Sequence, residues 1–164
     1  TAYEIVDCDW SSDVCSSDLS KNSSSVAVCI RSFEDTPKKI LNTLGGVESI
    51  QFYNNALKII LKKFKNPKFF FFSNNSKNID DFLSKSLEFK RYSIKLITPQ
   101  TGFIGDFENL WLLSNFKNLI ISNSTYYWWG AYFSKQRFLR NTVISSTKFP
   151  NKHTNLDEWL RVKS

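Results

Sequence analysis

Short apolar runs alternate with amphipathic stretches along most of this chain. The apolar runs have the length and the β-branched or aromatic content of strands covered on both faces: 26–31, 68–73, 94–97, the residues that end at Ile121, and 142–145. In other stretches, apolar residues return at spacings of three and four. That spacing predicts helices that begin after Ser49 and after 74–76, and helices over 106–116, 125–133 and 156–162. We expect a loop at 36–46, where Pro37 and two glycines interrupt both periods.

This alternation predicts an α/β fold. Strands joined by helices over this length favour a doubly wound parallel sheet with right-handed crossovers, formed as one domain by residues 25–164. The composition agrees, because 41% hydrophobic and 16% aromatic residues suffice for a core in a chain of 164 residues. No run approaches the roughly 20 apolar residues that a membrane-spanning helix needs.

The formal net charge of +7 changes this picture little. The lysines are spread along the chain, whereas a nucleic-acid surface gathers basic residues on one face together with aromatic residues for base stacking. They accompany many Asn, Ile and Phe residues, which is the composition that an AT-rich genome produces. We therefore expect no nucleic-acid partner.

Several kinds of site lack the residues that they need. The sequence has no G-x-G-x-x-G fingerprint for a dinucleotide and no G-x-x-x-x-G-K-[ST] loop for a nucleoside triphosphate. His153 is the single histidine and is expected at the surface, and Cys29 lies in an apolar run as a small core residue. We expect no metal site, since one His and one usable Cys cannot form a zinc or iron centre.

Polar residues follow three of the expected strands. Arg31 ends the first strand, Ser73 ends the second, and Asn123, Ser124 and Thr125 connect the fourth to the aromatic helix. At the carboxyl edge of an open α/β sheet, an arginine and the N–H groups of a helix start together suit a phosphate group. The sequence therefore predicts an anion site at this edge.

The polar turn before the aromatic helix and the arginine after the first strand also have a purely structural interpretation. A Ser/Thr turn commonly caps a helix, and this helix would bury Trp128 and Trp129 in the core. An arginine after a strand can also lie along the surface and pair with a neighbouring acid, here Glu34 or Asp35. The residues alone leave both alternatives open.

The N-terminal segment has a different character. Residues 9–19 show neither period, and they resemble the in-frame translation of a common sequencing-adapter oligonucleotide. We expect residues 8–19 to be non-native, the whole segment 1–24 to be non-native or disordered, and the natural sequence before Ser20 to be missing. A natural linker rich in Ser and Asp is the alternative.

Longer stretches of the chain carry a resemblance to a known enzyme family. Gly45–Ala56 (GGVESIQFYNNA) and Asn66–Ser73 (NPKFFFFS), with Asp106–Ser114 (DFENLWLLS) and Ile121–Ala131 (ISNSTYYWWGA), look like the middle and the last long motif of glycosyltransferase family 11, the α-1,2-fucosyltransferases. The family motif H-x-R-R-G-D-Y falls on Cys29–Asp35, where only the Arg and an acidic residue are kept; a bacterial branch with I-R-[ST]-[FY]-E is closer. Another departure replaces S-D-D after the second strand by Ser-Asn-Asn.

The resemblance implies a Rossmann-like domain that binds GDP-β-L-fucose, as the C-terminal half of a GT-B-like two-domain fold. Enzymes of this family transfer L-fucose with inversion to a galactose 2-hydroxyl of a glycan or polysaccharide, with no cofactor and no obligatory metal. On this basis we expect a galactoside α-1,2-fucosyltransferase, in the cytoplasm or peripherally at the inner face of a bacterial membrane. Its partners would be the nucleotide sugar donor and a galactose-terminated glycan acceptor. As a fragment, the chain would be inactive alone.

The resemblance also implies roles for the polar residues at the strand ends. Arg31 would hold the β-phosphate of the donor as the charge of the leaving group develops. Ser124 and Thr125 would supply hydroxyl and N–H donors to the same phosphates, and Asn123 would fix the turn. Ser73 would complete the donor site.

An inverting transfer also needs a base near the acceptor hydroxyl. Glu34 is the expected catalytic base, with Asp35 beside it as the alternative. Two other functions stay open for this fold: a non-catalytic module that binds a nucleotide sugar or a glycan, and a transferase that uses another nucleotide sugar.

Overall fold

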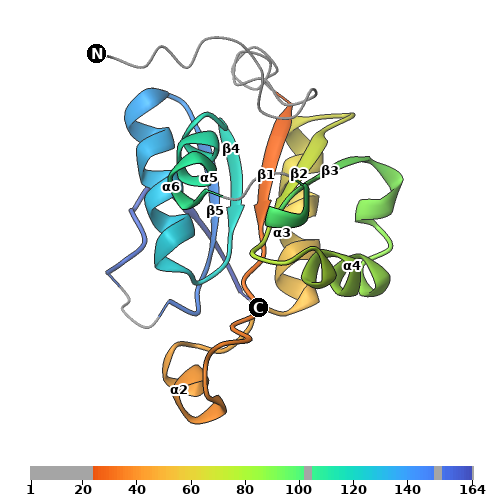
Figure 1. The fold of residues 1–164 in the computed structure, drawn as a ribbon. Helices are drawn as coiled ribbons and strands as arrows, with labels where there is room; N and C mark the ends of the chain where they lie inside the picture. Colours follow the sequence, from red (N-terminus) through yellow and green to blue (C-terminus); the bar gives the residue numbers. More distant parts are fainter. Residues whose placement is uncertain (1–23, 102–104, 150–152, 164) are drawn as a thin grey trace, which may run out of the picture.

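A computed structural model describes residues 24–101, 105–149 and 153–163. They form a six-stranded parallel sheet with helices on both faces (Figure 1). The prediction of an α/β fold with a doubly wound, Rossmann-like parallel sheet is confirmed. Residues 1–23 lie outside the described part, and with them the segment 8–19 that we expect to be non-native.

The strands follow the order β3-β2-β1-β4-β5-β6 across the sheet. Their bounds are β1 Ser25–Cys29, β2 Lys68–Phe72, β3 Ser93–Ile97, β4 Asn118–Ile121, β5 Thr142–Ser146 and β6 Leu160–Val162. The central strand β1 pairs with β2 on one side and with β4 on the other, so that Val28 lies between Phe71 and Ile120. The strand order therefore reverses at β1 and β4, the place where open α/β sheets form a crevice beyond their carboxyl ends.

Helices of different length connect the strands. Their bounds are α2 Lys38–Thr43, α3 Ile50–Lys63, α4 Ser76–Lys85, α5 Asp106–Ser114 and α6 Thr125–Arg137, with 3-10 turns at Phe89–Arg91 and Pro99–Thr101. The helices α3 and α4 cover one face of the sheet, α5 and α6 cover the other, and α2 projects beyond the strand ends (Figure 1). Ser49 caps α3 as predicted, since its Oγ accepts a hydrogen bond of 3.1 Å from the Phe52 amide.

Side chains that alternate along the strands build two apolar layers. Cys29 and Phe72 belong to the layer with α5 and α6, whereas Val28 and Phe71 belong to the layer with α3 and α4. Each of these four side chains is at most 2% exposed. A strand covered on both faces is apolar at successive positions, which explains the continuous apolar runs in the sequence. Cys29 is confirmed as a core residue, and burial raises the pKa of its thiol.

The predicted helix at 156–162 is wrong, because residues 160–162 form β6. Leu156, Trp159 and Val162 return at every third position, and this spacing imitates one face of a helix. In the structure Trp159 and Val162 are buried, but 160–162 pair with 144–146 of β5. The open edge of β5 supplies hydrogen-bond partners that no local pattern reveals.

Two smaller expectations also fail. Residues 36–46, expected as a loop, contain the short helix α2, which buries none of its residues. Trp129, expected in the core with Trp128, is 48% exposed, whereas Trp128 is partly buried and donates its indole N–H to the Thr154 carbonyl at 2.7 Å. Consecutive helix residues point in different directions, so only one of the two tryptophans can face the sheet.

The layer beside α3 and α4 generates a stability prediction. Phe71 is fully buried, and its ring centroid lies 5.6 Å from that of Phe82 and 5.5 Å from that of Phe89. Phe71→Ala should lower the free energy of unfolding by about 3–5 kcal/mol, because its neighbours cannot refill the space. Leu139→Ala, at a fully exposed position, is the control and should change it by less than about 0.5 kcal/mol. Urea denaturation measures both, and equal effects would contradict the described core.

Candidate functional site

A cavity of about 700 Å³ lies beyond the carboxyl ends of the central strands. This volume is typical of small-molecule sites, and its position is the crevice expected where β1 and β4 separate. Residues from the ends of four strands and from the start of two helices line it: Arg31, Phe33, Thr36, Leu44, Phe72, Ser73, Asn74, Ile97, Pro99, Asp106, Asn109, Asn123, Ser124, Thr125, Tyr126, Tyr127, Phe149 and Thr154.

The cavity brings together the residues that we predicted to bind the donor. Arg31, Ser73, Asn123, Ser124 and Thr125 all line it, although they follow three different strands. The strands are adjacent in the order β2-β1-β4, and parallel pairing places their carboxyl ends at one edge of the sheet. The tertiary structure thus joins segments that are far apart in the sequence.

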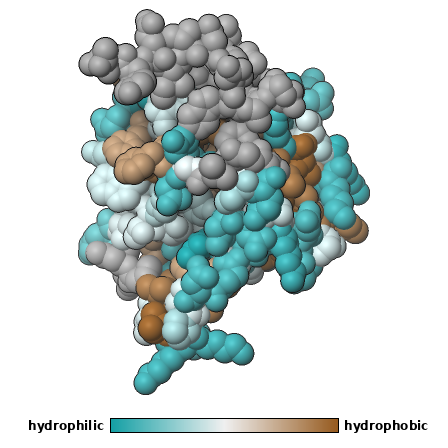
Figure 2. Space-filling model, viewed as in Figure 1, coloured by the Kyte–Doolittle hydropathy of each residue, from teal (hydrophilic) through white to brown (hydrophobic). Residues whose placement is uncertain are grey.

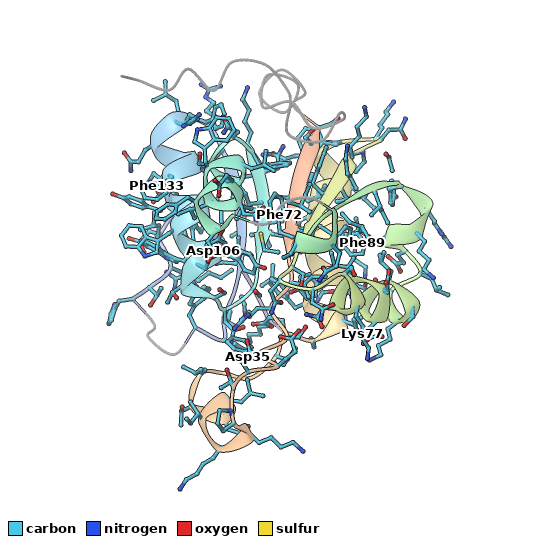
Figure 3. The ribbon with its side chains drawn as sticks, in the orientation of Figure 1. Asp35, Phe72, Lys77, Phe89, Asp106 and Phe133 are labelled. Carbon is cyan, nitrogen blue, oxygen red and sulfur yellow. The ribbon has the colours of Figure 1, made fainter. Side chains whose placement is uncertain are left out.

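Arg31 is the cation of this cavity, since no other described residue that lines it is basic. Its side chain is 28% exposed, and its guanidinium carbon lies 5.4 Å from the centroid of the Phe33 ring. One guanidinium nitrogen is 3.9 Å from the carboxylate of Asp35, which is 81% exposed and lies between the strand ends and α2 (Figure 3). An exposed contact of this length stabilises little, so a phosphate can compete with Asp35 for the guanidinium.

The loop after β1 holds a residue in an unfavourable backbone conformation. Phe33 has a φ of +57°, in the left-handed region that residues other than glycine rarely adopt. This conformation accompanies the position of its ring beside the Arg31 guanidinium. Backbone strain of this kind persists only where surrounding contacts impose it, and it is frequent at binding sites.

The start of α6 presents backbone donors to the cavity. The Trp128 amide donates to the Ser124 carbonyl at 2.9 Å, which closes the first turn of the helix. The amides of Thr125, Tyr126 and Tyr127 precede this bond and have no acceptor inside the helix. Ser124 is the N-cap residue, but its hydroxyl makes no capping hydrogen bond. The helix dipole and these donors together favour an anion here.

Asn123 holds a neighbouring loop. Its side-chain nitrogen donates to the carbonyls of Leu44 and Gly46 at 2.8 and 2.9 Å. Its Oδ1 is buried and finds no hydrogen-bond partner within the described part of the chain. Asn123 thus ties the end of β4 to the loop before α3, and its role in fixing the turn before α6 stays a prediction.

Glu34 is not among the residues that line the cavity, and amide groups hold its carboxylate. Asn78 of α4 donates to it, and Asn74 Nδ2 lies 3.4 Å from it; the same Asn78 nitrogen lies 3.3 Å from Ser73 Oγ. Partial burial acts to raise the pKa of Glu34. The hydrogen bonds from Asn78, from the backbone and from Asn74, with the charge of Arg31, outweigh burial and leave the pKa lowered. A lowered pKa makes a weaker base, and the catalytic role of Glu34 stays a prediction.

Some lining residues escaped the sequence analysis. Asp106 and Asn109 come from the first turn of α5, and Phe149 and Thr154 follow β5. Tyr127 lay inside the recognised motif, but we attached no role to it. The hydroxyl of a buried tyrosine needs a partner, and this requirement could have identified it.

Other kinds of site find less support. Across the described ranges, no three or more His, Cys, Asp and Glu side chains gather to hold a metal ion, and His153 is exposed. No helix in this part of the chain combines the length and the apolar character that crossing a membrane requires. Figure 2 shows hydrophilic residues over α4 and at the tip of the α2 projection, which agrees with lysines that serve as solvated surface.

The loop that Asn123 holds depends on Gly45. The φ of Gly45 is +85°, and a Cβ atom there would lie 2.1 Å from the Lys148 carbonyl oxygen and 3.1 Å from Asn123 Nδ2. Gly46 is a matched control, because its φ is +72° but a Cβ atom would meet nothing within 4 Å. Gly45→Ala should therefore lower the free energy of unfolding by about 1–3 kcal/mol more than Gly46→Ala. Thermal or urea unfolding of the pair tests this, and equal losses would show that the loop is not packed as described.

The contacts of Glu34 predict a pH dependence. Its folded pKa lies below the ordinary value of 4.5, so ionised Glu34 contributes stability above about pH 4.5 that is lost as the pH falls through the folded pKa. Asn78→Ala should raise the pKa of Glu34 and should destabilise the protein less in acid than near neutral pH. Ser84→Ala, at an exposed position of the same helix, should leave both the pKa of Glu34 and the pH dependence of the stability unchanged. NMR titration of the Glu34 carboxyl measures the shift, and an unchanged pKa in Asn78→Ala would refute the assignment.

Comparison with known proteins agrees with the geometry of the cavity. The sequence profile of glycosyl transferase family 11 matches residues 8–163. An alpha-1,2-colitosyltransferase from Escherichia coli is 26% identical over 156 residues, which cover 90% of this chain and 50% of that protein. The chain thus spans about half the length of this curated relative. No solved structure matches it significantly.

The match to the family profile extends over nearly the whole chain and includes every residue that lines the cavity. It confirms the resemblance that the motifs indicated, and it accounts for the Rossmann-like sheet. This chain belongs to glycosyl transferase family 11.

Proposed function

We propose that this chain binds a nucleotide sugar through its diphosphate and is the donor-binding half of a glycosyltransferase. The observation that carries the proposal is the convergence, in one cavity, of the Arg31 guanidinium and the first turn of α6. A forked cation and a row of backbone N–H groups together match the oxygens of a diphosphate. Membership of the family supports the same assignment.

The chemistry of sugar transfer explains why these groups are needed. As the bond between the sugar and the diphosphate breaks, negative charge develops on the leaving phosphate. Arg31 and the N–H groups of α6 are fixed before the reaction and stabilise that charge without reorganisation. We assign further donors to the hydroxyls of Ser73, Ser124 and Thr125. We propose a transfer with inversion that needs neither a cofactor nor an obligatory metal.

The acceptor hydroxyl must lose a proton during the transfer. Glu34 and Asp35 follow Arg31 directly and are our candidates for the base. Asp35 is exposed and contacts Arg31 at 3.9 Å, whereas Asn78 and Asn74 hold Glu34. In the complete enzyme, Glu34→Gln and Asp35→Asn distinguish them, since loss of the base should lower kcat by about 10²–10⁴-fold.

The proposed donor is GDP-β-L-fucose and the proposed acceptor is a galactose 2-hydroxyl, as in an α-1,2-fucosyltransferase. A colitose donor is the second candidate, because the curated relative is a colitosyltransferase. We further propose that a second domain of a GT-B-like fold completes the acceptor side, since the chain spans about half of that relative. A location in the cytoplasm or at the inner face of a bacterial membrane belongs to the same proposal.

Binding of GDP tests the diphosphate site. Arg31→Ala should weaken GDP binding by about 10- to 100-fold, because it removes a charge-assisted hydrogen bond. Arg31→Lys should retain part of the affinity, since it keeps the charge and loses the fork. Lys39→Ala is the matched control: it removes the same charge from the exposed helix α2 and should leave the affinity unchanged.

Calorimetric titration measures these affinities. Titration with GMP gives the contribution of the second phosphate, and titration with ADP gives the contribution of the guanine ring. Weaker binding of GMP than of GDP would support the diphosphate site. Equal affinities of Arg31→Ala and Lys39→Ala would refute the role of Arg31. A folded chain that binds no GDP would overturn the proposed function for this chain.

A further inference from the structure

We propose that Tyr127 is a positioning residue that fixes Arg31 relative to the first turn of α6. The inference deepens the proposed function and rests on it, because the two groups that Tyr127 joins are the two halves of the proposed diphosphate site. The sequence motifs give Tyr127 no role different from those of its aromatic neighbours. The hydrogen bonds of its hydroxyl in the folded chain distinguish it from them.

The hydroxyl of Tyr127 has one proton to donate and lies within hydrogen-bond distance of the backbone at the ends of two strands. It lies 3.1 Å from the carbonyl oxygen of Ile30 and 3.3 Å from that of Phe72, and the side chain is 5% exposed. Burial raises the pKa of this hydroxyl well above its usual value, so it stays protonated and donates. The Ile30 carbonyl and the Arg31 amide belong to one peptide unit, and the bond therefore acts directly on the backbone that carries the guanidinium.

The same residue belongs to the start of α6. With Ser124 as the N-cap, Tyr127 is the third residue of the helix and lies in the first turn, which lines the cavity. Its side chain has only two rotatable bonds and is held by burial. One rigid group thus ties the helix start to the end of β1. A binding site with a charge on one element and N–H donors on another depends on such a tie, because small displacements weaken both contacts.

A second tyrosine provides a matched control on the other face of the sheet. Tyr53 of α3 is 2% exposed, and its hydroxyl donates to the Cys29 carbonyl at 3.0 Å. It therefore holds the same strand one residue earlier than Tyr127 does. Tyr53 is absent from the cavity lining and its helix contributes nothing to the proposed site. Removing either hydroxyl deletes a buried donor to backbone carbonyls at the end of β1, but only Tyr127 connects to the site.

Phenylalanine substitutions remove the hydroxyls and keep the rings. Tyr127→Phe should weaken GDP binding about fivefold, the effect of one hydrogen bond, whereas Tyr53→Phe should change it by less than about twofold. In the Arg31→Ala background, Tyr127→Phe should have no further effect on GDP affinity, because it acts through Arg31. Equal affinities of the two Phe variants, or an undiminished effect of Tyr127→Phe without Arg31, would overturn the inference.

Amide hydrogen exchange of the full chain without ligand tests the tie independently of GDP. Tyr127→Phe should accelerate exchange at the Trp128 amide, whose hydrogen bond to the Ser124 carbonyl closes the first turn of α6, and Tyr53→Phe should not. If the wild-type chain binds no GDP but this amide responds, the proposed function fails and the positioning role of Tyr127 stands. If this amide does not respond, the positioning role fails whatever the chain binds.

Discussion

The central strand β1 sets the constraint on which the site depends. It is paired on both edges, with β2 and with β4, and it is covered on both faces by apolar layers. The chain can leave such a strand only at its end, and there the carbonyl groups lose their sheet partners. Two tyrosines from opposite faces satisfy them, Tyr53 at Cys29 and Tyr127 at Ile30. The next residue is Arg31. The charge of the cavity therefore follows directly on the strand that is paired on both edges and covered on both faces.

The electrostatics of the cavity are local. The chain carries a net charge of +7, yet Arg31 is the one basic residue among the described residues that line the cavity. The remaining attraction for an anion comes from backbone N–H groups at the start of α6, which are uncharged and fixed by the helix. The proposed diphosphate site would select a phosphate by geometry, whereas scattered lysines would only raise a general attraction for polyanions.

The polar residues at the strand ends divide into two kinds. Asn123 and Glu34 use their side chains for internal hydrogen bonds, to the loop before α3 and to Asn78 of α4 respectively. Ser124 and Thr125 instead face the cavity at the start of a helix. The first kind holds neighbouring loops and helices in place, and the second kind lines the cavity. The aromatic residues of α6 divide in the same way: Tyr127 is buried against the strands, whereas Phe133 lies on the outer side of the helix (Figure 3).

The sequence by itself determined the class of fold, five of the six strands and which polar residues follow the strands at one edge of the sheet. Continuous apolar runs arise only in strands covered on both faces, and polar residues after such runs must lie at the carboxyl edge. The tertiary structure alone decided three features: that 160–162 pair with β5, that Trp129 faces outward, and that Tyr127 and Asn78 reach backbone or side chains of other elements. Each depends on a partner far away in the chain. Local periodicity predicts which residues are buried, but it does not predict which distant element packs against them.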